Sequence, residues 1–186
     1  MPRVISGILR GRRLATLSGE HTRPTSDKVK EAVFSSLGDL AGDSFLDLFA
    51  GCGQMAIEAY SRGANEVVLV ESNQHAFSVI CQNLKQCNLQ KDDVLALKKR
   101  ALDVVMDWSE KKTFSIIYAD PPWTELNSQW WQECWASLPR IMNEDSVLYL
   151  EIPIDCNLTS NQLLLSKEYQ YGRIKISKWI KRGLDA

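Results

Sequence analysis

The stretch that decides the fold is Ser44-Phe-Leu-Asp-Leu-Phe-Ala-Gly-Cys-Gly53. Its apolar residues form an almost continuous run, which is typical of a strand buried on both faces of a parallel sheet. The run ends in Gly51-Cys52-Gly53, and a helical pattern begins at Gln54. A strand, a glycine turn and a helix N-terminus together predict a small-molecule site at the carboxyl end of a central strand.

Asp47 is the unusual residue of this strand, because it places a carboxylate among apolar side chains. Burying such a group costs free energy unless another group pairs with it. We therefore expect a ligand that brings positive charge or hydrogen-bond donors to this position.

Composition favours one compact domain over residues 1–186, since 45% of the 186 residues are hydrophobic. We divide it into a basic N-terminal hairpin and loop (1–25) and an α/β core (26–186). No apolar run has the length of a membrane span, and the first residues do not resemble a signal peptide. Five cysteines without a Cys-x-x-Cys pair indicate neither disulfides nor a metal site, and they favour the cytoplasm.

The net charge of -1 conceals an uneven distribution of charge. Residues 1–30 carry seven basic and two acidic side chains, and residues 167–186 carry six and two. The segment between them carries nine basic and nineteen acidic side chains. Basic ends on an acidic body suit either a protein that binds a polyanion or simply solvated termini. Arg10, Arg12 and Arg13 lie at the tip of the predicted hairpin, where they form either a phosphate clamp or a solubilising loop.

Further buried strands are predicted over 66–71, 94–97, 114–119 and 146–152, with helical patterns between them. Tyr169–Trp179 alternates apolar and polar residues, which predicts one further strand, antiparallel or at an edge. Such alternation of strands and helices implies a doubly wound α/β sheet. The tryptophans of 130–135 have helical spacing, so we interpret them as packing residues.

Glu71 ends the second strand, eighteen residues after Gly53. An acid at about this spacing accepts hydrogen bonds from ribose hydroxyls in nucleotide-binding α/β folds. Gly51, Gly53 and Ala56 also satisfy the dinucleotide fingerprint, so a nicotinamide enzyme is one alternative.

The loop Asp120-Pro121-Pro122-Trp123 follows the fourth strand and is stiff, because its two prolines fix φ and remove two N–H donors. It offers a carboxylate and carbonyl oxygens beside an aromatic face. These groups suit a planar ring that bears an NH2 group: the ring stacks on Trp123, and the amine donates to Asp120 and the Pro121 carbonyl. A nicotinamide enzyme gives no account of this loop.

The two loops together resemble class I S-adenosylmethionine-dependent methyltransferases that modify exocyclic amines of nucleobases. Five further segments resemble the bacterial RsmD family, which methylates N2 of one guanine in small-subunit ribosomal RNA. These segments are Arg3-Val-Ile-Ser-Gly7, Arg10-Gly-Arg-Arg-Leu14, Thr22-Arg-Pro-Thr-Ser-Asp27, Val29-Lys-Glu-Ala-Val-Phe34 and Ser61-Arg-Gly-Ala64. The resemblance is strongest over 1–71 and 114–123.

This resemblance implies a Rossmann-like, seven-stranded, mostly parallel sheet with one antiparallel strand. It implies S-adenosylmethionine as the cofactor, and 16S ribosomal RNA or a small-subunit assembly intermediate as the partner of a monomeric, cytoplasmic enzyme. The implied catalytic residues are Asp120, Pro121, Pro122 and Trp123. The implied cofactor residues are Asp47, Phe49, Ala50, Gly51, Gly53, Glu71, Ser72 and Ala101. The implied RNA-binding residues are Arg10, Arg12, Arg13 and Arg23.

One departure concerns the adenine end of the cofactor, where the family has an acidic residue followed by alanine. Here Arg100 precedes Ala101, and the nearest acid is Asp103. Either backbone groups or Asp103 would then bind the adenine. Two rival functions stay open at this point: adenine-N6 methylation, and RNA binding without catalysis.

Overall fold

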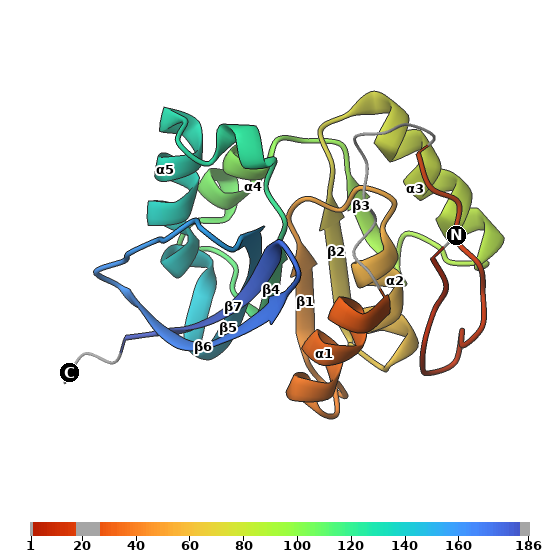
Figure 1. The fold of residues 1–186 in the computed structure, drawn as a ribbon. Coiled ribbons are helices and arrows are strands. Elements are labelled where there is room, and N and C mark those ends of the chain that lie inside the picture. Colours follow the sequence, from red (N-terminus) through yellow and green to blue (C-terminus); the bar gives the residue numbers. More distant parts are fainter. Residues whose placement is uncertain (1, 18–26, 183–186) are drawn as a thin grey trace.

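A computed structural model describes residues 2–17 and 27–182, and its centre is a seven-stranded sheet in the order β3-β2-β1-β4-β5-β7-β6 (Figure 1). The strands are β1 (Ser44–Asp47), β2 (Glu66–Val70), β3 (Leu95–Leu97), β4 (Phe114–Ala119), β5 (Met142–Pro153), β6 (Leu163–Tyr171) and β7 (Ile174–Lys181). The strands from β3 to β5 pair in parallel, whereas β7 is antiparallel to both neighbours. The expected Rossmann-like sheet with one antiparallel strand is therefore confirmed.

Helices cover both faces of the sheet, as the apolar pattern of the buried strands requires. They are α1 (Asp27–Leu37), α2 (Gln54–Ser61), α3 (Gln74–Gln86), α4 (Ala101–Trp108) and α5 (Gln129–Ser137), with 3-10 turns at Trp123–Glu125 and Leu138–Ile141. One core cluster joins the sheet to α1, α2 and α3, and a second joins it to α4 and α5. Trp131 is 1% exposed in the second cluster, so its packing role is confirmed.

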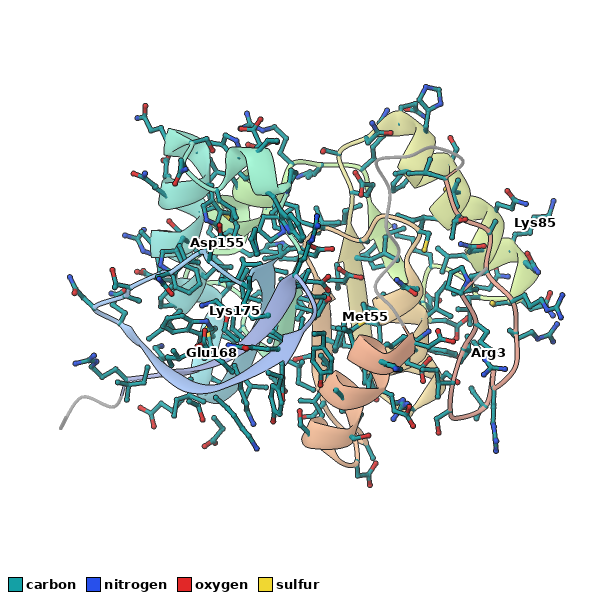
Figure 2. All side chains as sticks on the ribbon, viewed as in Figure 1. Arg3, Met55, Lys85, Asp155, Glu168 and Lys175 are labelled. Atoms are coloured by element: carbon teal, nitrogen blue, oxygen red, sulfur yellow. The ribbon has the colours of Figure 1, made fainter. Side chains whose placement is uncertain are left out.

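The prediction of one strand over Tyr169–Trp179 is wrong. The segment turns back on itself at Gly172, whose φ of 63° lies in the left-handed region, and so it contributes to both β6 and β7. The side-chain alternation continues across this tight turn, which is why the sequence resembles a single strand. β6 forms the edge and β7 lies inside it, and a Lys175–Glu168 ion pair of 3.0 Å joins the two strands (Figure 2).

The predicted N-terminal hairpin is present as an antiparallel loop with a single bridge, between Arg3 and Arg13. It is held to the core by buried polar groups. Glu58, which is fully buried on α2, accepts hydrogen bonds from the backbone N–H groups of Ile5 (2.7 Å) and Ser6 (3.0 Å). Glu58 also lies 3.5 Å from the buried ammonium of Lys30.

A second anchor is Asn83 on α3, which is fully buried. Its amide oxygen accepts from the Ala15 N–H (2.8 Å), and its amide nitrogen donates to the carbonyls of Ala15 (3.0 Å) and Cys52 (2.8 Å). This one side chain therefore connects the N-terminal segment to the glycine turn. Within the described part of the chain, no helix is long and apolar enough to cross a membrane.

Candidate active site

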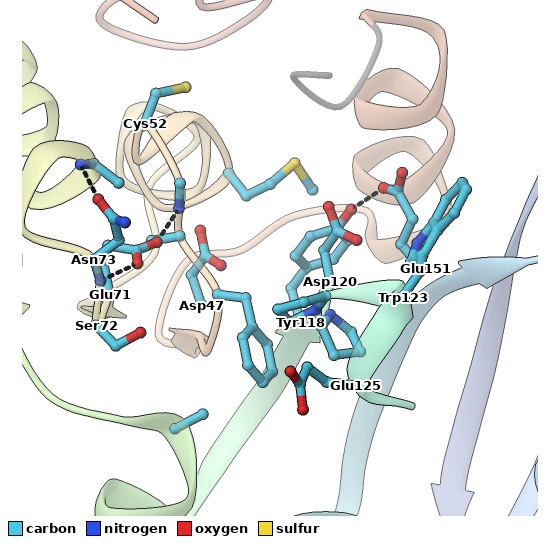
Figure 3. Close-up of a pocket in the computed structure, with 18 of the residues that line it drawn as sticks. Asp47, Cys52, Glu71, Ser72, Asn73, Tyr118, Asp120, Trp123, Glu125 and Glu151 are labelled. Atoms are coloured by element: carbon cyan, nitrogen blue, oxygen red, sulfur yellow. Dashed lines mark hydrogen bonds between the residues drawn. The ribbon is translucent and has the colours of Figure 1, made fainter. Parts of the chain in front are cut away.

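A large cavity lies at the carboxyl ends of β1, β2, β4 and β5, where the two loops singled out in the sequence face each other (Figure 3). Its volume of about 1360 Å³ exceeds the roughly 300–1,000 Å³ of a typical small-molecule pocket. The cavity therefore has room for a nucleoside cofactor and for a second planar ring.

The chain reaches this cavity from β1 through backbone hydrogen bonds that continue past the strand. Leu48 N–H donates to the Tyr118 carbonyl (3.0 Å) and Ala50 N–H to the Val70 carbonyl (3.0 Å), which fixes the loop between β4 and β2. Gly51 (φ 57°) and Gly53 (φ 80°) then adopt the left-handed conformation that glycine allows. This turn directs the start of α2 toward the cavity.

Glu71 fastens the glycine turn to the next helix. Its carboxylate accepts hydrogen bonds from the backbone N–H groups of Gly51 (2.9 Å) and Asn73 (2.7 Å). Asn73 in turn caps α3, because its side-chain oxygen accepts from His75 and Ala76 N–H groups. A carboxylate has about four acceptor positions, so Glu71 can hold this turn and still bind a hydroxyl group.

Asp47 is a buried carboxylate in an unfavourable electrostatic environment. It is 1% exposed, and neither of its oxygens has a hydrogen-bond partner among the described residues. Burial, and then the nearby charge of Glu71, raises its pKa to about 7. The N–H groups of Phe49 and Ala56 oppose this rise, although neither forms a hydrogen bond of normal geometry with it.

Asp120 stands on the opposite side of the cavity from Glu71, and Asp47 lies between them (Figure 3). Burial raises the pKa of Asp120 well above the usual range, and the charges of Glu151 and Asp47 add to that rise. Trp123 lines the cavity and is 43% exposed, so part of its side chain is accessible to a ligand. Pro121 is buried, whereas Pro122 accepts a hydrogen bond from Glu125 N–H (2.9 Å), which closes a 3-10 turn.

The structure brings most of the predicted site residues to this one cavity. Those that line it are Asp47, Phe49, Ala50, Gly51, Glu71, Ser72, Ala101, Asp120, Pro121, Pro122 and Trp123. Gly53 does not line it and instead forms the N-cap of α2. Arg100 lines it beside Ala101, whereas Asp103 is exposed in the first turn of α4 and is not among the described lining residues.

The predicted RNA-binding arginines lie elsewhere. Arg10, Arg12 and Arg13 are exposed on the N-terminal loop, outside the described lining of the cavity. This loop rests on α2, with Ile8 N–H donating to the Ser61 carbonyl (2.8 Å). Arg23 lies outside the described residues.

Several lining residues were not anticipated from sequence: Thr16, Leu17, Tyr118, Glu151, Tyr171, Arg173 and Ile174. Glu151 carried a usable signal, since it is an acid near the carboxyl end of a buried strand, as Glu71 is. Tyr171 and Arg173 reach the cavity through the β6–β7 turn, which the sequence did not reveal.

Five carboxylates thus line the cavity: Asp47, Glu71, Asp120, Glu125 and Glu151. Such a site favours ligands that carry positive charge and several N–H or O–H donors. Within residues 2–17 and 27–182, no group of three or more potential metal ligands is arranged to hold an ion.

A family model described as "Conserved hypothetical protein 95" matches residues 2–180. A Bacillus subtilis protein named "Putative rRNA methyltransferase YlbH" is 34% identical over 192 residues, covering 97% of this chain and 100% of that protein. A Haemophilus influenzae "Ribosomal RNA small subunit methyltransferase D" is 33% identical over 121 residues, covering 64% of this chain and 63% of that protein. The solved structure of "Putative methyltransferase yhhF" from Escherichia coli superposes with a TM-score of 0.81 at 23% identity, covering 97% of this chain and 98% of that chain.

Proposed function

The chain belongs to the family described as Conserved hypothetical protein 95, the RsmD family, and from that premise we propose that it transfers a methyl group from S-adenosylmethionine to the N2 amine of a guanine in 16S ribosomal RNA. One observation carries the proposal. The glycine turn with its unpaired buried Asp47 and the Asp120–Trp123 loop line the same cavity from neighbouring strands. Each loop supplies half of a methyl-transfer site.

The charge of the cavity fits the cofactor. S-adenosylmethionine carries an ammonium and a sulfonium. Among the described residues the Asp47 carboxylate has no hydrogen-bond partner, and an ammonium would provide one. Phe49, Ala50, Gly51 and Gly53 would shape the binding of the amino acid end. Glu71 would accept from the ribose hydroxyls, with Ser72 and Ala101 beside the adenine.

Arg100 stands where an acid would meet the adenine amine, and the structure leaves Asp103 exposed in the first turn of α4. We therefore assign adenine recognition to backbone groups near Ala101. A guanidinium beside a flat ring also suits stacking.

S-adenosylmethionine, when bound, supplies an electrophilic methyl group; transfer of this group to an amine nitrogen would break the methyl–sulfur bond, leave S-adenosylhomocysteine and release a proton. The protein acts mainly by position and polarity. The Asp120 carboxylate and the Pro121 carbonyl would each accept a hydrogen bond from one N–H group of the amine. These two hydrogen bonds would keep the nitrogen lone pair directed at the methyl carbon. The raised pKa of Asp120 also suits it to take up the released proton. Trp123 would stack on the base at the rim.

The exposed arginines of the N-terminal loop, with Arg23, would bind RNA phosphates as guanidinium forks do. We take the substrate to be 16S ribosomal RNA or a small-subunit assembly intermediate, the enzyme to be a monomer, and its place to be the cytoplasm, where small subunits assemble.

The test is transfer of labelled methyl groups from S-adenosylmethionine to small-subunit RNA taken from cells that lack the protein. We expect N2-methylguanosine in the digested RNA. Asp120→Asn should abolish transfer while S-adenosylmethionine binding, measured by calorimetry, persists. The exposed Asp92→Asn serves as the matched control. N6-methyladenosine would establish the rival base, and RNA binding without any transfer would establish the non-catalytic alternative.

A further inference from the structure

Glu151 is a carboxylate beside Asp120 that the methyl transfer described above does not use. In the parallel pairing of β4 and β5, Ala119 lies opposite Leu150. Asp120, which directly follows β4, and Glu151 on β5 are therefore the next two residues along these neighbouring segments. Glu151 is 6% exposed and lines the cavity. Figure 3 shows its carboxylate on the same side of the cavity as Asp120 and Trp123.

The carboxylate of Glu151 is held in place by a residue of the neighbouring strand β4. The Tyr118 hydroxyl donates to Oε2 at 2.5 Å, a length typical of a hydrogen bond to an ionised carboxylate. Tyr118 lies on β4 and Asp120 directly follows that strand, and both line the cavity (Figure 3). A fixed anion next to Asp120 costs free energy, as the influence of its charge on Asp120 shows. A ligand with adjacent donors would offset this cost.

Guanine has such an edge, because its N1–H lies directly beside the N2 amine and both are donors. Adenine presents its amine next to N1, which is an acceptor. Two neighbouring carboxylates can accept from N1–H and from the N2 amine of guanine, whereas adenine would place the N1 lone pair against a buried anion.

We propose that Glu151 determines base specificity by accepting a hydrogen bond from N1–H of the target guanine while Asp120 holds the amine. This role of Glu151 rests on the proposed function and adds one requirement, a hydrogen on N1 of the target base. Tyr118 acts on specificity through Glu151 and is a positioning residue.

The probe is an RNA with 2-aminopurine in place of the target guanine. This base keeps the 2-amino group and lacks the N1 hydrogen. The target is first mapped by labelled methyl transfer into small-subunit RNA, and the segment is then prepared with either base. We expect kcat/KM for the wild-type protein to be on the order of 10²-fold or more higher for guanine.

Glu151→Gln should bring the two substrates to within a few fold, because a glutamine amide can also donate to an N1 acceptor. Tyr118→Phe should lower the ratio of kcat/KM for guanine to that for 2-aminopurine by less than Glu151→Gln does. Glu144→Gln changes an exposed residue of the same strand and should leave the ratio unchanged. Calorimetric binding of S-adenosylmethionine by each variant shows that the fold and the cofactor site are intact.

A guanine to 2-aminopurine ratio that stays the same in Glu151→Gln would overturn the assignment of Glu151. A wild-type protein that methylates no guanine during the mapping step would instead refute the proposed function. The two failures appear in different experiments and are therefore distinguishable.

Discussion

Replacing Asp47 by asparagine should stabilise the protein in the absence of ligand and weaken cofactor binding. The Asp47 carboxyl has an ordinary pKa of 3.8 and a pKa of about 7 in the folded protein. A carboxyl whose pKa is raised on folding favours the folded state less as the pH rises between these two values. At 1.36 kcal/mol per pKa unit, the ionised Asp47 lowers the free energy of unfolding by about 4 kcal/mol once the pH is above 7.

The cost is only partly present at pH 5, where it is about 2 kcal/mol, and nearly complete at pH 8. Asparagine keeps the shape of the side chain and cannot ionise. Asp47→Asn should therefore be more stable than the wild type by an amount that grows by about 2 to 3 kcal/mol from pH 5 to pH 8. The loss of the Asp47 charge from the surroundings of Asp120 acts in the same direction.

Urea unfolding of both proteins at the two pH values measures this difference. Titrating groups remote from Asp47 affect both proteins alike, and Asp92→Asn controls for the loss of an exposed carboxylate. Saturating S-adenosylmethionine should narrow the difference by about 1.4 kcal/mol or more, since the wild type gains a charged partner for Asp47 and the variant should bind at least about tenfold more weakly. An unfolding difference that is equal at pH 5 and pH 8 would refute the account of Asp47 as a buried carboxylate without a partner.

Three further predictions concern the substrate side and the N-terminal segment. Trp123→Ala should raise KM for RNA by about 5-fold to 150-fold with a smaller effect on kcat, because stacking contributes about 1–3 kcal/mol per base; an unchanged KM would argue against a stacked base. The rate of methyl transfer should rise with pH as Asp120 loses its proton, and Glu151→Gln should move this rise to lower pH, because it removes a charge that raises the pKa of Asp120; a pH–rate profile tests the sign. Asn83→Ala should lower the free energy of unfolding by about 2–4 kcal/mol, as it leaves the Ala15 and Cys52 backbone groups without this partner; urea unfolding beside the exposed Gln82→Ala control on the same helix measures it.

The sequence was sufficient for the parallel half of the sheet and for both loops of the site. Buried strands such as Phe114–Ala119 are marked by unbroken apolar runs, and the loop residues follow them directly. These signals are local, so they survive without knowledge of the tertiary structure.

The features that the sequence did not reveal depend on which strands become neighbours. Glu151 matters because β5 lies beside β4 in a register that sets it next to Asp120. Arg173 reaches the cavity only because the chain turns at Gly172, where an isolated glycine within an alternating pattern gave too weak a signal. The carboxylate pair and the hairpin are therefore products of register and topology.

The buried attachment of the N-terminal loop constrains the evolution of this protein. Glu58, Lys30 and Asn83 are fully buried partners of that loop, so a chain that lost the loop would expose or orphan all three at once. Gly7 adds a steric constraint, because a Cβ there would lie 1.6 Å from the Ser61 carbonyl oxygen. The loop and the core must consequently be inherited together, and an exchange of this extension between related enzymes would succeed only if its buried contacts on α1, α2 and α3 travelled with it.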